Sequence, residues 1–243
     1  MPAPCLRRRG GKHEPATEAA KGHSVNQPAP HAHIRIDFVS DVSCPWCAIG
    51  LHSLEQALGR LKGKLDAEIH LQPFELNPRL PAEGEDATEH LARKYGSSAQ
   101  QIEANREAIR ERGAEVGFIF DMDRRARIYN TFDAHRLLHW AELEGRQLPL
   151  KHALLKAYFT DGEDVSSHDT LIRLAGAVGL DEMRARQVLG RDEYANEVRK
   201  QERYYLDRGI QSVPATIIND QHLITGGQPV EIFERMLRPF AQA

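Results

Sequence analysis

Two cysteines stand three positions apart in the segment Cys44-Pro45-Trp46-Cys47, a C-x-x-C pattern. The pattern follows a predicted strand and opens a predicted helix, and the unpaired N–H groups and partial positive charge of a helix start favour a thiolate on Cys44. The thiolate is the reactive species in disulfide exchange. Pro45 suits a first helical turn, and the spacing allows a disulfide between the two cysteines. We therefore predict that Cys44 attacks a substrate and Cys47 resolves the product.

A C-x-x-C pair can also be half of a structural zinc site, which needs four ligands. The third cysteine of the chain, Cys5, stands far from the pair in the sequence. His52 follows Cys47 by five positions, but a second histidine at the spacing of a zinc motif is missing. The residue pattern thus favours redox chemistry, and we expect no metal site.

The segments around the pair alternate between strand and helix. Residues 34–38 alternate in the manner of a strand. Leucines recur at helical spacing from Leu51 to Leu61, and Gly63 ends that helix. Ile69 and Leu71 indicate a second strand. A strand, a helix and a strand in this order predict a right-handed parallel βαβ unit.

The middle of the chain, from about residue 85 to residue 208, has helical patterns throughout. Within it, Ser98 precedes a polar helix and Ser167 is expected to cap another. Two late strands, Ala215–Ile218 and His222–Thr225, flank a turn and precede a last helix. The order βαβ, helical block, ββα predicts an α/β fold that is interrupted by an all-helical insertion.

Composition excludes several classes of protein. Residues 1–33 are rich in proline and glycine and lack periodicity, so we expect them to form a disordered tail. The 32 Lys and Arg residues against 35 Asp and Glu argue against a dedicated nucleic-acid binder. No apolar run suits a membrane span, and no apolar signal segment follows the early arginines. A cytoplasmic protein that binds neither nucleic acid nor membrane is expected, while its oligomeric state is not predicted.

The chain resembles the DsbA family of thioredoxin-fold proteins, and within it the FrnE-type branch of bacterial dithiol-disulfide oxidoreductases. The cysteine motif at a strand-to-helix junction carries this resemblance, which covers about residues 34–240. Three further segments support it: Tyr129-Asn130-Thr131-Phe132-Asp133-Ala134-His135-Arg136-Leu137, Val213-Pro214-Ala215 and Gly226-Gly227-Gln228-Pro229. The resemblance implies a thioredoxin-like fold and the activity of a protein dithiol-disulfide oxidoreductase.

The resemblance also implies a division of the chain into two parts. Residues 34–80 and 205–243 are expected to form the thioredoxin-like domain, and residues 81–204 a helical lid over the cysteines.

Pro214 is expected in a cis peptide bond that faces the cysteines, with Val213 offering backbone groups to a bound substrate. Asn130 and His135 are expected in the lid near the cysteines, with packing and capping as their alternative role. One feature of such proteins is missing, because Phe38 stands six residues before Cys44, where they carry a buried acid. Asp37 and Asp41 are out of register, which leaves His135 or water to transfer a proton.

Two other functions remain open at this stage. Isomerases and transferases of the 2-hydroxychromene-2-carboxylate isomerase and kappa types share the lid architecture and use glutathione. They commonly have serine at the position of Cys44 and lack the second cysteine, so the presence of Cys47 favours disulfide exchange. A chaperone-like binder without enzyme activity is the third alternative. The expected partners are thiol or disulfide substrates, protein or small molecule, with glutathione as a candidate redox partner and no bound cofactor.

Overall fold

A computed structural model describes residues 32–81 and 83–242. The expected tail, residues 1–33, lies outside the described residues except for Ala32 and His33, which begin the first strand. In chain order, the elements are β1 (Ala32–Ser40), α1 (Pro45–Arg60), β2 (Leu65–Pro73), β3 (Glu85–Asp86), α2 (Ala87–Tyr95), α3 (Ala99–Glu115), β4 (Arg127–Ile128), α4 (Phe132–Leu143), α5 (Gln147–Phe159), α6 (His168–Ala177), α7 (Glu182–Gly190), α8 (Ala195–Asp207), β5 (Ala215–Ile218), β6 (His222–Thr225), α9 (Val230–Leu237) and a 3-10 helix (Arg238–Ala241). In the described ranges, no helix is both long enough and apolar enough to cross a membrane.

In the described part of the chain, β1, β2, β5 and β6 form one sheet in the order β2-β1-β5-β6. β1 and β2 run parallel, with Phe38 opposite Leu71, and α1 connects them. β5 pairs antiparallel with both β1 and β6. The predicted βαβ unit and the late hairpin are confirmed, and the chain has the expected mixed α/β fold.

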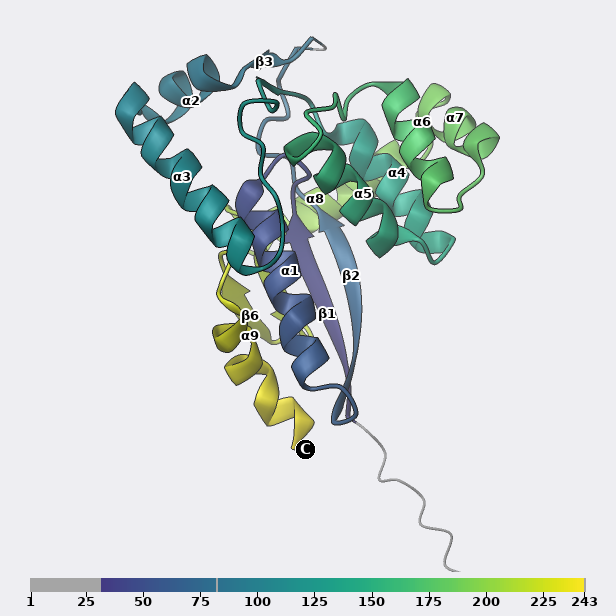
Figure 1. The fold of residues 1–243 in the computed structure, drawn as a ribbon. Coiled ribbons are helices and arrows are strands. Elements are labelled where there is room, and N and C mark those ends of the chain that lie inside the picture. Colours follow the sequence, from purple (N-terminus) through teal and green to yellow (C-terminus); the bar gives the residue numbers. More distant parts are fainter. Residues whose placement is uncertain (1–31, 82, 243) are drawn as a thin grey trace, which may run out of the picture. The chain divides into compact units, whose positions relative to one another are not determined.

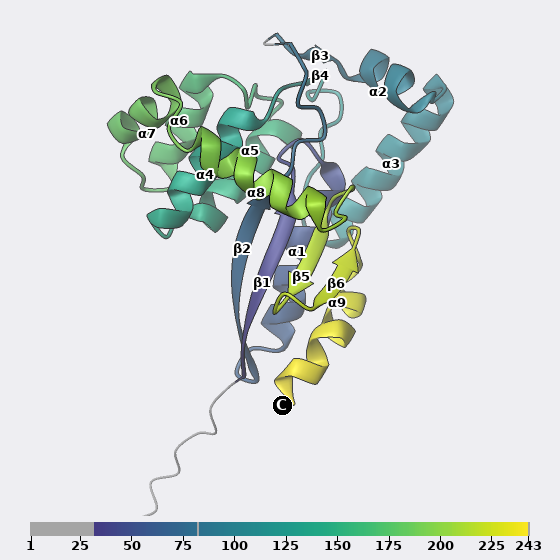
Figure 2. The same ribbon diagram turned by 180° about the vertical axis from the view of Figure 1, so that it is seen from behind.

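Helices cover both faces of this sheet. α1 and α9 lie side by side on one face, where Ile36 of β1 and Leu54 of α1 belong to the same apolar cluster (Figure 1). α8 crosses the other face, where Tyr205 packs in a second cluster with Val39 of β1 (Figure 2). Because successive side chains of a strand point to opposite faces, β1 is buried on both sides. This burial gives the helix that follows the strand a rigid base.

The segment between β2 and β5 differs from the expected all-helical insertion in one respect. β3 and β4 form a short antiparallel pair in which Glu85 lies opposite Ile128. The Arg127 guanidinium supports the pair by donating hydrogen bonds to the carbonyl oxygens of Glu83 and Gly84. The expectation was wrong here because strands of two residues are too short to leave an alternating pattern in the sequence.

Two serines precede helices that the sequence predicts, and of these only Ser167 was expected to be a cap. The hydroxyl of Ser98 accepts a hydrogen bond from the Gln101 N–H, and the Gln101 side chain accepts one from the Ser98 N–H. This capping box fixes the start of α3. Ser167 holds the N-cap position of α6, but its side chain makes no capping hydrogen bond.

The first turns of α1 lie against the segment that follows β6 with almost no free space. A Cβ added at Gly227 would lie 2.6 Å from the carbonyl oxygen of Trp46. A Cβ added at Gly50 would lie 3.2 Å from both the Cα of Gly227 and the Cγ of Pro214. Glycine is required at Gly227, because a Cβ there would overlap rigid backbone, and a Cβ at Gly50 would make a tight contact with Pro214.

We predict that Gly227→Ala lowers the free energy of unfolding by about 1 to 3 kcal/mol, since the new methyl group overlaps rigid backbone. Gly59→Ala is the matched control in α1, because nothing lies within 4 Å of a Cβ at Gly59. That control should raise the stability by about 0.5 to 1 kcal/mol through helix propensity. Urea unfolding of the three proteins measures both effects, and equal behaviour of the two variants would contradict the tight contact.

Candidate active site

Cys44 is the N-cap residue of α1, which begins at Pro45. Its backbone is extended, with φ −93° and ψ 114°, and its carbonyl oxygen accepts a hydrogen bond from the Ala48 N–H at 3.3 Å. Both cysteines of the motif are free thiols. Cys44 keeps 4% of its surface exposed, whereas Cys47 is fully buried. The two sulfurs therefore have different surroundings although they lie within one helical turn.

A cis peptide bond between Val213 and Pro214 lies beside the cysteines, as the resemblance implied. The carbonyl oxygen of Val213 lies 3.8 Å from the Sγ of Cys44, although 169 positions separate the two residues. The Pro214 carbonyl oxygen accepts a hydrogen bond from the Gly226 N–H at 2.8 Å. This bond ties the start of β5 to the end of β6, so the backbone of Val213 has a fixed position next to the sulfur.

A cavity of about 690 Å³ borders Cys44. Pro45, Trp46 and Val213 also line it, together with residues 74–77, which follow β2. α2 and α3 supply the opposite wall. That wall combines apolar side chains with polar ones, and its members include Lys94, Gln101, Ile102, Asn105, Arg106 and Ile109. The site can thus hold a molecule with both apolar and polar parts against the sulfur of Cys44.

Asn130 and His135, expected near the cysteines, do not line this cavity. The Asn130 Oδ1 accepts a hydrogen bond from the Phe132 N–H at 2.9 Å and so caps the start of α4. His135 is buried, and its Nε2 donates a hydrogen bond to the carbonyl oxygen of Phe74 at 3.1 Å. Both residues make the packing and capping contacts of their alternative role, and substrate contact by either stays a prediction.

His135 also faces a buried carboxylate, with its Nε2 3.6 Å from the Oδ1 of Asp41. The carboxylate accepts hydrogen bonds from the N–H groups of Ser43 at 3.1 Å and Leu76 at 2.7 Å. Burial alone would raise the pKa of Asp41, but His135 and the two N–H groups outweigh it and lower the pKa to about 2. Asp41 is therefore an anion that joins the turn before Cys44 to the segment after β2.

Lys151 of α5 adds a buried cationic group near the cysteines. Its side chain is fully buried, and among the described residues its Nζ has no hydrogen-bond partner. Burial lowers the pKa of Lys151, whereas negative charge on Cys47, Asp41 and Cys44 opposes this shift. Burial, followed by the neighbouring sulfur of Cys44, raises the pKa of Cys47, and Lys151 opposes that shift. Lys151 is thus harder to protonate and Cys47 harder to ionise than in water, and each group affects the pKa of the other.

Gln147, one helical turn before Lys151, fixes the start of α5 against the sheet. Its Oε1 accepts a hydrogen bond from the Leu71 N–H at 2.8 Å, and its Nε2 donates one to the Leu71 carbonyl oxygen at 3.0 Å. The amide of Gln147 therefore satisfies both backbone groups of Leu71 on β2, the edge strand. This anchoring sets the position of α5 relative to the helix that carries the cysteines.

Sequence reasoning missed Lys151 and the role of Asp41. The signal for Lys151 was present, because Leu154, Leu155 and Tyr158 follow it at helical spacing and are all buried. A lysine on such a core-facing stripe is rarely fully buried unless it is paired. Asp41 left no comparable signal, since its partners His135 and Leu76 are distant in the sequence.

Comparison with known proteins agrees with this geometry. The profile of the DSBA-like thioredoxin domain matches residues 35–238. The chain belongs to the DSBA-like thioredoxin domain family. A probable DsbA oxidoreductase from Streptomyces coelicolor has 32% sequence identity and a TM-score of 0.79, and the match covers 86% of this chain and 90% of that one. The expected DsbA-like membership is confirmed, and the similarity supports an oxidoreductase or isomerase enzyme.

Two more distant DsbA-like structures share the fold alone. The cytosolic disulfide reductase DsbM from Pseudomonas aeruginosa, solved with glutathione, has 15% identity and a TM-score of 0.59, with coverage of 86% of this chain and 100% of that one. A 2-hydroxychromene-2-carboxylate isomerase has 12% identity and a TM-score of 0.61, with coverage of 86% and 96%. The same architecture thus occurs in proteins described as a reductase and as an isomerase.

This DsbA-like chain departs from the expected pattern at Phe38. The side chain is fully buried in the core, at the position where a buried acid was expected. Two other buried ionisable groups lie nearby. Lys151 affects the pKa of Cys47, and Asp41 affects the pKa of Lys151. The proton chemistry of the pair therefore has a different set of groups available from the one that the resemblance implies.

We predict that Asp41→Asn lowers the free energy of unfolding at pH 7 by about 2 kcal/mol, because the folded state holds the carboxylate pKa below its unfolded value of 3.8. A depressed acid pKa stabilises the fold above the unfolded pKa. The contribution is lost as pH falls from about 4 through about 2.

Denaturant unfolding at a series of pH values measures this difference. The difference in the free energy of unfolding between the parent protein and Asp41→Asn should disappear as pH falls to about 2. Asp66→Asn, an exposed position on β2, is the matched control and should leave stability nearly unchanged at every pH. A gap that stays constant across the pH range would contradict the charged state assigned to Asp41.

Proposed function

We propose that the chain is a protein dithiol-disulfide oxidoreductase of the FrnE-type branch, in which Cys44 attacks the substrate and Cys47 resolves the product. The asymmetry of the pair carries this proposal. Cys44 borders the cavity beside the Val213 carbonyl group. Cys47 is buried, and Lys151 partly opposes the rise in its pKa that burial causes. Disulfide exchange needs such a pair, because one sulfur must contact the substrate and the other must then attack the mixed disulfide.

In the first step, the Cys44 thiolate attacks one sulfur of a substrate disulfide. A bond forms between the two sulfurs, the substrate S–S bond breaks, and the second substrate sulfur leaves as a thiolate that takes a proton from water. The start of α1 stabilises the negative charge on Cys44 before the attack. Val213 holds the substrate beside Cys44, and Pro45 and Trp46 form the adjacent edge of the cavity.

In the second step, Cys47 attacks the Sγ of Cys44 and releases the substrate as a thiolate. The enzyme ends with a Cys44–Cys47 disulfide, so its dithiol has lost the two electrons that the substrate has gained. Cys47 must first lose its proton, which its burial opposes. We propose that the Nζ of Lys151, which makes no direct hydrogen bond within the described residues, takes this proton through one intervening water molecule and becomes an ammonium group.

The loss of negative charge on Cys44 favours this proton transfer once the mixed disulfide has formed. Negative charge on Cys44 is one of the influences that raise the pKa of Lys151. In the mixed disulfide that charge is gone, so one influence that raises the pKa of Lys151 is lost and its Nζ gives up a proton more easily. The same steps in reverse oxidise a dithiol substrate, and the site geometry serves either direction.

The cavity suits a thiol compound or an extended peptide segment as substrate. Its volume of about 690 Å³ and the polar side chains of Gln101, Asn105 and Arg106 favour a molecule with amide and carboxylate groups. The structure of DsbM holds glutathione, and this likeness supports glutathione as a redox partner of the present chain. The description of DsbM as cytosolic supports the cytoplasm as the compartment.

We expect Cys44→Ser to reduce exchange with glutathione disulfide or a disulfide-bonded peptide to the uncatalysed rate, because the attacking sulfur is lost. Cys47→Ala should accumulate a mixed disulfide, seen in mass spectrometry as the added mass of one substrate thiol. Cys5→Ser is the control and should keep the parent rate. Full activity of Cys44→Ser would disprove the proposal. Full turnover of an electrophile with glutathione by Cys47→Ala would favour the isomerase or transferase alternative.

Lys151→Met should slow resolution of the mixed disulfide at pH 7 by at least about tenfold, because Cys47 loses its base. The first step should keep its rate. The variant should remain folded, since methionine removes a buried amine that has no hydrogen-bond partner among the described residues.

Stopped-flow kinetics across a pH series separates the two steps. In Lys151→Met the resolution rate should rise with pH until Cys47 ionises unaided, and thermal unfolding checks that the variant is intact. An unchanged resolution rate and pH profile would remove Lys151 from the mechanism while leaving the roles of the two cysteines in place.

A further inference from the structure

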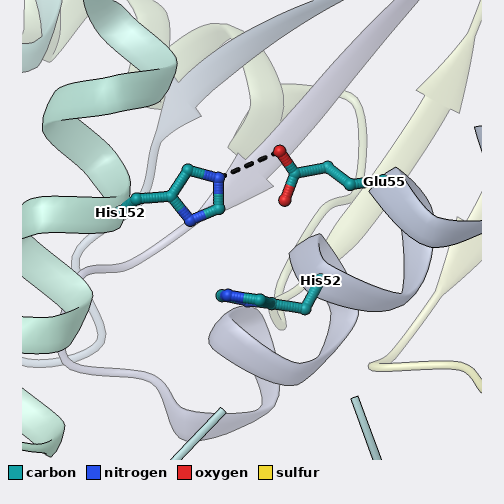
Figure 3. Close-up of side chains that lie close together, drawn as sticks. All are labelled: His52, Glu55 and His152. Atoms are coloured by element: carbon teal, nitrogen blue, oxygen red, sulfur yellow. Dashed lines mark hydrogen bonds and ion pairs between the residues drawn. The ribbon is translucent and has the colours of Figure 1, made fainter. Parts of the chain in front are cut away.

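Three potential metal ligands from two helices meet away from the cavity. His52 and Glu55 lie one turn apart on α1, and His152 comes from α5 (Figure 3). One donor atom from each side chain lies within 4.8 Å of the other two. Figure 3 shows the Glu55 carboxylate next to the His152 ring, with the His52 ring below both. The cluster thus joins the helix of the cysteines to the helix of Lys151.

His52 is set up to offer a lone pair. Its Nδ1 lies 2.9 Å from the Ala48 carbonyl oxygen, and a carbonyl group only accepts hydrogen bonds, so Nδ1 carries the proton. The other ring nitrogen, Nε2, is therefore the acceptor of the neutral ring. Metal-binding histidines generally have this arrangement, with the second nitrogen donating to a backbone carbonyl group.

Glu55 and His152 complete the donor set. The His152 Nε2 lies 2.9 Å from the Glu55 Oε1. The side chains keep 33% and 29% of their surface exposed, so an ion can reach them from solvent. Phe118 packs on His52 with 5.0 Å between ring centroids, which limits the movement of that ring. Two imidazoles and one carboxylate with a side open to water form a donor set typical of zinc and related divalent ions.

We propose that His52, Glu55 and His152 bind a divalent transition-metal ion of the zinc type, with water in the remaining position. On binding, the ion takes the place of the hydrogen bond between the His152 Nε2 and the Glu55 Oε1, and the neutral His152 ring carries its proton on Nδ1. The ligand atoms must move closer together, because zinc binds nitrogen and oxygen at about 2.0 to 2.2 Å. This proposal does not depend on the proposed redox function, since none of its ligands belongs to the cysteine pair.

Occupation of this site would join α1 to α5. Cys44 and Cys47 lie at the start of α1, and Lys151 directly precedes His152 on α5. An ion that binds only the folded arrangement stabilises it by mass action. At a concentration about 100-fold above its dissociation constant, zinc should raise the midpoint of thermal unfolding by about 5 to 10 °C.

The test uses the full chain with Cys44→Ser and Cys47→Ser, so that these thiols do not take the metal. Calorimetric titration with zinc chloride and absorption titration with cobalt chloride count the sites and report their ligands. Removing one ligand by His52→Ala, His152→Ala or Glu55→Gln should weaken one site by at least about tenfold. The same variants should lose the zinc-dependent rise in unfolding temperature.

His168→Ala is the matched control. His168 pairs with Asp133 at 2.7 Å but belongs to no three-ligand cluster in the described residues, so zinc binding should be unchanged. Zinc binding that is equal in the parent background and in His52→Ala would place the ion elsewhere and overturn the proposal. The lack of a saturable site in the parent background would also overturn it and leave the cluster as a hydrogen-bonded His152–Glu55 pair beside His52.

Discussion

The close contact between the first turns of α1 and the segment from Val213 to Gly227 fixes the start of α1, and with it Cys44, against the cis bond before Pro214. Backbone meets backbone there, because a Cβ on Gly227 would overlap the Trp46 carbonyl oxygen. This approach brings the Val213 carbonyl oxygen to 3.8 Å from the Cys44 sulfur. β1 and β5 pair directly below the contact, so the sheet holds the two chain segments together.

Around this contact the chain buries charge of both signs. Asp41 is stabilised as an anion by His135 and by two backbone N–H groups, so its charge has local partners. Lys151 has no such hydrogen bonds among the described residues, and its protonation depends on the charges of Cys47, Asp41 and Cys44. A fixed anion therefore supports the architecture of the turn, while the pKa of the Lys151 amine depends on whether the cysteines are charged.

The segment between β2 and β5 contributes to the surroundings of the cysteines in two places. α2 and α3 form one wall of the cavity, whereas α5 reaches the opposite side of α1 with Lys151 and His152. Gln147 anchors α5 by satisfying both backbone groups of Leu71 at the edge of the sheet. Because α5 starts from this anchor, a short stretch of the insertion supplies a group for the proposed proton transfer and a ligand for the proposed metal site.

The sequence by itself determined the features that depend on neighbouring residues. The C-x-x-C spacing, the βαβ unit and the hairpin strands Ala215–Ile218 and His222–Thr225 follow from local periodicity and turn residues, and family likeness supplied the cis bond before Pro214. Only the tertiary structure placed Lys151 near Cys47 and His152 beside His52, since each pair is separated by about a hundred positions. Spacing rules describe ligands on one helix or loop, whereas these groups meet because packing against β2 fixes α5 next to α1.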